Sequence, residues 1–314
     1  MRAVLQRSFG DPDVLEMDEV ERPDPLPTEV LVKVDAAGIN PVDTKTRQGK
    51  GMASILGEPP FIPGWDVSGT VEELGMGVTT LAVGDRVFGM VRFPHAGSAY
   101  AEYVTAPSRH LARTPEGLDA MAAAGLPLAG LTAWQILVDT AAVEPGQRVL
   151  VHAAAGGVGH LAVQIAKARG AHAIGTASGD KHGFLASIGI DQAIDYSATR
   201  FEDEIHEPVD LVVDLVGGDE QGTGSLTVLR DGGLLIAVPG GVSDDLLAAA
   251  EDQGKRAGGI LVEPDRAGLE NLARLVESDS LRVEVDEEFP LADAAAAHAH
   301  LEGGHGAGKT VLRV

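Results

Sequence analysis

The sequence predicts an α/β fold in which a mostly β N-terminal region precedes a parallel sheet covered by helices. Short strand-like runs punctuated by glycine lie before residue 120. After residue 145, apolar strand-like runs alternate with helical patterns, as they do in a parallel sheet that is buried on both faces. A glycine-rich turn joins the first of these strands to the first helix. These three observations also predict two domains.

The N-terminal region is expected to form a barrel-like antiparallel sheet. Glu29–Ala36 (EVLVKVDA) alternates apolar and polar residues like a half-buried strand, and Trp65–Leu74 and Arg86–Phe88 look similar. The segment PFIPG at residues 60–64 and the regular glycines favour folded sheet over a linker. The glycines that punctuate these runs are Gly64, Gly69, Gly75, Gly77, Gly84 and Gly89.

An uncharged stretch, Ala120–Val138, lies between the two regions. It is rich in alanine and interrupted by Gly125, Pro127 and Gly130, so it predicts two buried helical pieces and not a membrane span. The N-terminus lacks an apolar core long enough for a signal peptide, which favours a cytoplasmic protein.

The second region is predicted to alternate strands and helices, and the tail Leu281–Val314 to contain a strand, an alanine-rich helix and a final strand. Helices are expected at Gly157–Arg169, Lys181–Ile188 and Arg266–Glu277. Strands are expected at Arg148–Ala153, His172–Ala177, Ala193–Tyr196, Val209–Val216 and Leu234–Val238, with an edge strand at Gly259–Val262.

The turn Ala154–Gly159 (AAGGVG) is the most informative site. It fits the G-x-G-x-x-G template with Ala154 in the first position. Gly156 lets the backbone approach a pyrophosphate, Gly159 allows close packing of helix on strand, and the helix N-terminus offers free N–H groups. Because a strand precedes the turn and a helix follows it, we expect dinucleotide binding. The alternative is a tight strand-to-helix turn that holds no ligand.

The end of the second strand indicates which dinucleotide is bound. NAD-dependent proteins place an acidic residue there for the ribose 2′-hydroxyl, whereas this strand ends without one. Ser178 and Lys181 are instead suited to the 2′-phosphate of NADPH. Asp180 is expected to point away from this site as part of a helix N-terminus. The alternative for Lys181 is a solvated helix residue.

Charge and composition exclude several other classes. Lys and Arg total 24 and Asp and Glu total 47, which gives a net charge of −23. Such a chain repels phosphate backbones and lacks the basic surface of a peripheral membrane protein, so neither nucleic acid nor membrane is an expected partner. The chain has no cysteine, which excludes disulfides, thiolate zinc sites and a cysteine nucleophile.

With these motifs together, the chain resembles the zinc-free quinone oxidoreductase branch of the medium-chain dehydrogenase/reductase superfamily, the zeta-crystallin-like family. The resemblance spans nearly the whole chain. It rests on Ala37–Asp43 (AGINPVD), Gly64–Gly69 (GWDVSG), Gly84–Gly89 (GDRVFG), Gly130–Trp134 (GLTAW), His152–Gly159 (HAAAGGVG) and Gly308–Val311 (GKTV).

The resemblance implies a GroES-like catalytic domain, residues 1–120 and 279–314, with a Rossmann NADPH-binding domain, residues 121–278, inserted into it. It implies that Asn40 and Thr132 lie near the nicotinamide. Apart from the resemblance, Lys309 is expected to reach the active cleft from the C-terminal tail and to contact the cofactor. The other implied cofactor-binding residues are Gly156, Gly157 and Val158 at the pyrophosphate, Ser178, Lys181 and Tyr196 at the 2′-phosphate, and Val238, Pro239 and Gly240 at the nicotinamide.

The departures from zinc-dependent relatives have chemical consequences. Those relatives place Cys near position 40 and His in a G-H-E-x-x-G motif, where this chain has Asn40 and Gly64-Trp65-Asp66. Asn is a poor zinc ligand and Trp is none, so no metal is expected. Without a Lewis acid, a conjugated enone or quinone is a better hydride acceptor than an isolated ketone.

Other patterns carry less weight. Gly303–Thr310 matches a phosphate-loop template but precedes a strand and not a helix, and His298, His300 and His305 are expected to be solvated residues at a helix end and not metal ligands. His152 is expected in the core and not as a proton donor. Asp43 either orients a loop, contacts substrate or caps a helix. Trp65 either walls a substrate pocket or belongs to the core.

Two classes of function follow. The first is a zinc-independent, NADPH-dependent reductase of quinones or α,β-unsaturated carbonyls, with acyl-chain enoyl reduction as a variant. The second is a non-catalytic NADPH-binding sensor or interaction protein. A homodimer is expected, because the edge strand at Gly259–Val262 would otherwise leave backbone groups unpaired.

Overall fold

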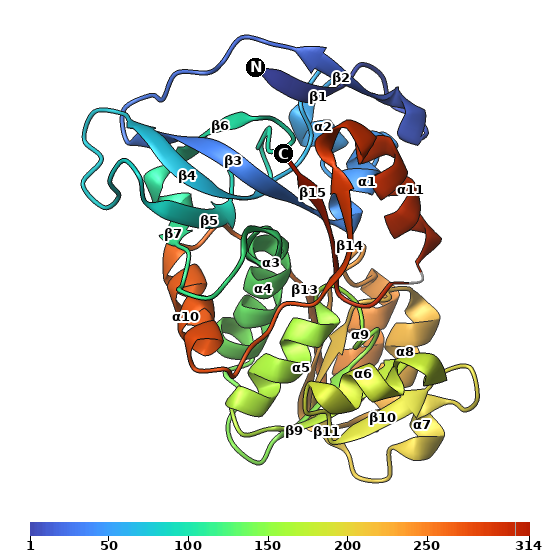
Figure 1. The fold of residues 1–314 in the computed structure, drawn as a ribbon. Helices are drawn as coiled ribbons and strands as arrows, with labels where there is room; N and C mark the ends of the chain where they lie inside the picture. The colour runs from blue at the N-terminus through green and yellow to red at the C-terminus, as the bar shows by residue number, and fades with distance from the viewer. Residues whose placement is uncertain (305) are drawn as a thin grey trace. The chain divides into compact units, whose positions relative to one another are not determined.

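The computed structural model describes residues 1–304 and 306–314. The chain divides into two compact units, residues 1–131 with 263–314 and residues 132–262 (Figure 1). Among the described residues, no helix combines the length and the apolar character needed to cross a membrane.

The first unit is built on a mostly antiparallel sheet in the strand order β14-β15-β3-β4-β5-β7, with β6 also paired to β3 (Figure 1). A hairpin of β1 (Arg2–Gln6) and β2 (Leu15–Glu19) stands apart from it. The strands of the sheet are β3 (Glu29–Ile39), β4 (Asp66–Leu74), β5 (Arg86–Met90), β6 (Tyr103–Pro107), β7 (Leu111–Arg113), β14 (Val285–Pro290) and β15 (Lys309–Arg313).

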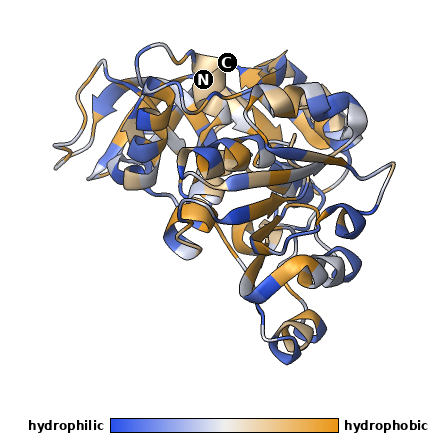
Figure 2. Ribbon diagram, turned by 90° about the horizontal axis from the view of Figure 1, so that it is seen from below, coloured by the Kyte–Doolittle hydropathy of each residue, from blue (hydrophilic) through white to orange (hydrophobic). Residues whose placement is uncertain are grey.

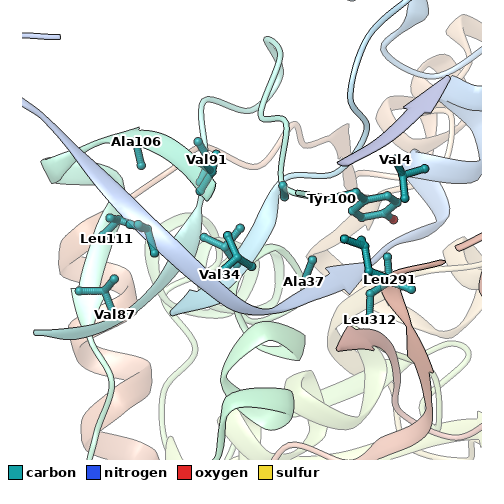
Figure 3. Close-up of a cluster of buried hydrophobic side chains, with 14 of the residues drawn as sticks. Val4, Val34, Ala37, Val87, Val91, Tyr100, Ala106, Leu111, Leu291 and Leu312 are labelled. Atoms are coloured by element: carbon teal, nitrogen blue, oxygen red, sulfur yellow. The ribbon is translucent and has the colours of Figure 1, made fainter. Parts of the chain in front are cut away.

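The C-terminal strand completes this unit. β15 runs antiparallel to β3, and Thr310 lies opposite Ile39. This register places Lys309 beside Asn40, although the two residues are far apart in the sequence. Buried valine, leucine and alanine side chains of this unit form one cluster, in which Val4, Leu291 and Leu312 lie near Tyr100 and Val87 and Leu111 lie at the other end (Figure 3). The helices of the unit are α1 (Pro41–Arg47), α2 (Ala53–Leu56), α3 (Ala120–Gly125), α10 (Arg266–Glu277) and α11 (Ala294–Gly303).

The second unit is a parallel sheet in the order β10-β9-β8-β11-β12-β13. Counted from its first strand, this is the order 3-2-1-4-5-6 of dinucleotide-binding folds, with the switch point between β8 and β11. Its strands are β8 (Arg148–Val151), β9 (His172–Ala177), β10 (Gln192–Asp195), β11 (Val209–Asp214), β12 (Leu229–Ala237) and β13 (Arg256–Gly259). Its helices are α5 (Gly159–Ala168), α6 (His182–Ser187), α7 (Phe201–Glu204), α8 (Asp219–Val228) and α9 (Asp244–Asp252).

Apolar burial follows the predicted periodicities. The central strands β8 and β11 are buried along almost their whole length, as strands covered on both faces are. The helices instead carry hydrophobic and hydrophilic residues side by side (Figure 2). In α10, for example, Leu269 and Leu272 are buried while Arg274 and Glu277 are exposed.

The boundaries between the units differ from those expected for the domains. The sequence placed α3 and α10 with the nucleotide-binding domain, whereas both belong to the first unit. α3 packs so closely on β3 that a Cβ at Gly38 would lie 2.3 Å from the Ala124 carbonyl oxygen. Likewise, a Cβ at Gly268 on α10 would lie 2.8 Å from Leu131. Such contacts depend on tertiary packing, which a change of rhythm along the sequence does not record.

The edge strand expected at Gly259–Val262 lies three residues earlier in the sequence. β13 occupies Arg256–Gly259, with Leu234 opposite Arg256 and Ala237 opposite Gly259. The apolar residues that suggested the later position follow the strand, and Leu261 among them is exposed. The position of this edge strand is therefore determined by its pairing with β12 and not by the apolar content of the sequence.

Candidate functional site

The glycine-rich turn of the second unit lies at the carboxyl end of β8, at the switch point of the sheet. β8 ends at Val151 and α5 begins at Gly159. Ligands bind outside the carboxyl ends of parallel strands at such a point, where a helix N-terminus offers N–H groups and the positive end of its dipole. Gly156, Gly157 and Val158 are half-buried in this turn, where the sequence placed them.

The glycines of the turn have different physical roles. A Cβ at Gly159 would lie 2.3 Å from the Ala153 carbonyl oxygen and 2.7 Å from the Ala154 Cα, so only glycine lets α5 start this close to the strand. A Cβ at Gly156 would meet one atom, the Ala153 oxygen, at 3.3 Å. The Gly156 position therefore leaves room for a ligand beside the backbone, which fits a dinucleotide pyrophosphate.

The end of β9 gathers the residues expected at the 2′-phosphate. Ser178 and Lys181 follow the strand in a short 3₁₀ turn. The sequence suggested that Asp180 points away from this site, but it does not. The Ser178 hydroxyl donates to Asp180 Oδ1, and Lys181 Nζ lies 3.7 Å from Asp180 Oδ2. The short turn brings the carboxylate back over its neighbours. Tyr196 follows the adjacent strand β10 and is 64% exposed.

The loop after β12 holds Val238, Pro239 and Gly240, the residues implied at the nicotinamide. Val238 donates its N–H to the Asp214 carbonyl oxygen at 3.0 Å. Gly240 has a φ of 79°, a conformation that favours glycine. The Asp214 carboxylate at the end of β11 accepts the N–H groups of Val216 and Gly217, both at 2.9 Å. Asp214, which the sequence reasoning missed, therefore shapes the loop next to this one.

His152 is a core residue, as expected. Its Nδ1 lies 3.2 Å from Thr176 Oγ1 and its Nε2 lies 3.1 Å from Ser225 Oγ. The ring also meets Phe201 edge to face, with ring centroids 4.6 Å apart. Burial lowers the pKa of His152 to about 4, so the imidazole is neutral near pH 7.

In the first unit, the structure brings Asn40 and Lys309 together in a buried polar cluster. Lys309 is 3% exposed, and its ammonium donates to the carbonyl oxygen of Ile39 at 2.8 Å and to Asn40 Oδ1. Because an ammonium can only donate, this contact fixes the orientation of the Asn40 amide. Asn40 Nδ2 then donates to Asp66 Oδ2 at 2.9 Å. The other Asp66 oxygen accepts the N–H of Leu128 at 3.0 Å.

Asp43 belongs to the same cluster and acts as a helix cap, one of its predicted roles. Its Oδ2 accepts the N–H of Asn40 at 2.7 Å at the start of α1. Its Oδ1 is buried and, within the described residues, has no hydrogen-bond partner. Burial raises the pKa of Asp43 to about 8, aided by the charge of Asp66. Asp43 therefore carries a proton near pH 7.

The Asp66–Lys309 pair then supplies the charge of the cluster. Burial raises the pKa of Asp66 to about 6, and it lowers the pKa of Lys309. The Asn40 amide lies between these two groups and hydrogen-bonds to both of them. The sequence showed Asp66 only as part of a motif. The signal that could have found it was an acidic residue at the start of a strand whose next five residues, Val67–Val71, carry no charge.

The structure favours the core alternative for Trp65. The side chain is 2% exposed, its indole N–H donates to the His95 carbonyl oxygen at 2.7 Å, and it meets Phe93 edge to face. Thr132 is buried in α4 (Pro127–Trp134), at the first residue of the second unit. The cofactor-binding roles implied for Thr132 and Lys309 stay predictions.

The tail histidines were predicted incorrectly in one respect. His298 is fully buried: Arg47 donates to its Nδ1 at 3.3 Å, so the ring proton sits on Nε2, 3.1 Å from the Tyr100 hydroxyl. The helical periodicity of α11 alone could not predict these partners, because they lie far away in the sequence. His300 pairs with Asp286 at 2.7 Å, and His305 lies outside the described residues. The phosphate-loop template runs from α11 into β15, as expected.

Comparison with known proteins gives consistent results. Residues 26–116 match the family model described as "Alcohol dehydrogenase GroES-like domain", and residues 188–312 match "Zinc-binding dehydrogenase". A 2-haloacrylate reductase from Burkholderia sp is 35% identical, covering 99% of this chain and 98% of the relative. An NADPH-dependent alkenal/one oxidoreductase from Arabidopsis thaliana is also 35% identical, and the match covers 99% of this chain and 79% of the relative.

Solved structures agree over the whole length. The quinone oxidoreductase of Coxiella burnetii is 41% identical with a TM-score of 0.94, covering 100% of this chain and 99% of its own. A mycobacterial protein solved in complex with NADPH is 32% identical with a TM-score of 0.88, covering 100% of both chains. The chain therefore belongs to the zinc-free quinone oxidoreductase branch of the medium-chain dehydrogenase/reductase family, whose members are oxidoreductases that use a nicotinamide dinucleotide.

Proposed function

We propose that the protein transfers hydride from NADPH to a quinone or an α,β-unsaturated carbonyl compound without a metal. The observation that carries the proposal is the hydrogen bonding of the Asn40 side-chain amide, at the position where zinc-dependent relatives have a cysteine ligand. Its amide is held between the Asp66 carboxylate and the Lys309 ammonium. A divalent cation placed here would meet a resident positive charge and an amide whose oxygen is already occupied.

The choice of acceptor follows from the missing Lewis acid. Bound NADPH supplies a hydride, and a conjugated acceptor takes it at an electron-poor carbon, so the developing enolate or phenolate needs only hydrogen bonds or water. Names of relatives support this class: a 2-haloacrylate reductase, an alkenal/one oxidoreductase and a 2-methylene-furan-3-one reductase. Each name describes a substrate in which a carbon–carbon double bond is conjugated to a carbonyl or carboxyl group.

We further propose that the second unit binds NADPH in preference to NADH. The turn at Gly156, Gly157 and Val158 would hold the pyrophosphate on backbone N–H groups. Ser178 and Lys181 would donate hydrogen bonds to the 2′-phosphate, and the exposed ring of Tyr196 would lie near the adenosine. The mycobacterial relative solved with NADPH supports the same cofactor.

A homodimer is the proposed assembly. β13 pairs with β12, and within the described part of the chain no strand pairs with its other edge. A Cβ at Gly258 would meet no atom within 4 Å, and Leu261 beside the strand is exposed. Pairing with the same edge of a second copy would cover both. Light scattering at micromolar protein tests this, and a monomer would contradict it.

The reaction is tested by NADPH oxidation with a panel of quinones, enals, enones and saturated ketones, before and after prolonged chelation. We expect turnover of the conjugated acceptors, little with saturated ketones, and no loss on chelation. Zinc-restored activity after chelation would contradict metal independence. Tight NADPH binding with no turnover of any acceptor would favour the alternative, a non-catalytic sensor.

A further inference from the structure

The corner expected to hold the 2′-phosphate contains a carboxylate that opposes it. Asp180 lies between Ser178, whose hydroxyl donates to it, and Lys181, whose ammonium is 3.7 Å away. Both of these contacts hold the pKa of Asp180 below its usual range, so it is ionised at neutral pH. The two groups proposed to bind the phosphate are therefore already engaged by a negative charge.

The Asp180 carboxylate is more accessible to a ligand than the nearby Asp195 carboxylate is. Its side chain is 70% exposed. Asp195, at the end of β10, instead accepts both the N–H and the hydroxyl of Ser197, at 2.9 and 2.6 Å. Asp195 also lies against the turn, because a Cβ at Gly179 would be 2.6 Å from its Oδ2. Asp195 therefore restricts the backbone of the turn, while the Asp180 carboxylate is exposed to solvent.

We propose that Asp180 is the residue that sets the balance between NADPH and NADH. It competes with the 2′-phosphate for Ser178 and Lys181 and repels it, because the phosphate carries a charge of about −1.5 to −2. The same carboxylate accepts a hydrogen bond from the 2′-hydroxyl of NADH, as acidic residues after the second strand of such sheets do. This inference rests on the proposed dinucleotide binding. It predicts that the protein binds both NADPH and NADH, and that Asp180 reduces its preference for NADPH.

The test is Asp180→Asn, which removes the charge but keeps an oxygen for the Ser178 hydroxyl. Removing the unit charge of Asp180 at about 4 Å in water from a phosphate of about −1.5 to −2 predicts NADPH binding tighter by roughly ten- to thirtyfold. NADH binding should weaken severalfold, because a charge-assisted hydrogen bond becomes a neutral one. The ratio of the two dissociation constants should therefore shift by more than about tenfold. Calorimetric titration of both proteins with both cofactors measures this ratio.

Asp231→Asn is the matched control, because Asp231 is an exposed acid at the amino end of β12, the edge of the sheet opposite Asp180. It should leave the ratio unchanged. Asp180→Ala should move the ratio in the same direction as Asp180→Asn. An unchanged ratio, or equal tightening of both cofactors, in a protein that still oxidises NADPH with an enone would overturn the role of Asp180 alone. Failure of the unmodified protein to bind either dinucleotide would overturn the proposed function as well.

Discussion

Replacing Asp43 with asparagine should change how the stability of the first unit depends on pH. Asp43 is 2% exposed and its folded-state pKa is about 8, against 3.8 in the unfolded chain. The folded protein therefore holds this proton more tightly than the unfolded chain does. The cost of ionising the buried acid is absent below about pH 4 and grows as the pH rises toward 8, by at most about 1.4 kcal/mol per pH unit.

Between pH 5 and pH 7 this linkage predicts a loss of roughly 2–3 kcal/mol in the unmodified protein. The asparagine of the variant has no proton to lose, yet its side-chain oxygen can still accept the N–H of Asn40. The Tm of the unmodified protein should therefore gain on that of Asp43→Asn as the pH falls from 7 to 5. At roughly 2–4 °C per kcal/mol, the gain is several degrees.

The assay is thermal unfolding of both proteins at several pH values in one ionic strength. Asp119→Asn, which removes an acid that caps α3 without being buried, controls for the general effect of losing a carboxylate. Parallel curves for Asp43→Asn and the unmodified protein across this range would refute the reasoning. They would mean that Asp43 is already ionised in the folded protein.

Two further substitutions test the account. Lys309→Met should lower the free energy of unfolding by about 3–5 kcal/mol, because it leaves the buried Asp66 carboxylate without the positive charge that stabilises it; a Tm close to that of the unmodified protein would contradict this charge interaction. Lys181→Ala should weaken NADPH binding by about 10- to 150-fold, with little change for NADH or kcat, because the 2′-phosphate lies far from the hydride. Equal weakening of both cofactors would show that Lys181 does not bind the phosphate.

Much of the fold could be predicted because its signals are local. Apolar strands and amphipathic helices have short-range periodicity, and the strand His172–Ala177 of the second unit and the helix Arg266–Glu277 of the first were predicted with the bounds observed. The edge strand was not, because β13 is rich in glycine and its position depends on pairing with β12. The unit boundaries likewise depend on packing between distant segments.

The candidate site divides in the same way. The glycine-rich turn was predictable because steric demands at Gly156 and Gly159 are written in consecutive residues. The buried cluster was not, because it joins Asn40, Asp66 and Lys309 through the register of β15 on β3. Asp180 was misplaced for a different reason: whether a short turn directs a side chain outward or over its neighbours is decided by backbone angles that the sequence leaves open.

The most direct test of the central claim follows the hydride itself. NADPH deuterated at the transferred position of the nicotinamide is incubated with the protein and a simple enone, and the saturated product is analysed by mass spectrometry and NMR. The account predicts one deuterium per product molecule, bound to the carbon β to the carbonyl, and one NADPH consumed for each molecule reduced. Product without deuterium, or deuterium on the carbonyl carbon of an alcohol, would contradict it.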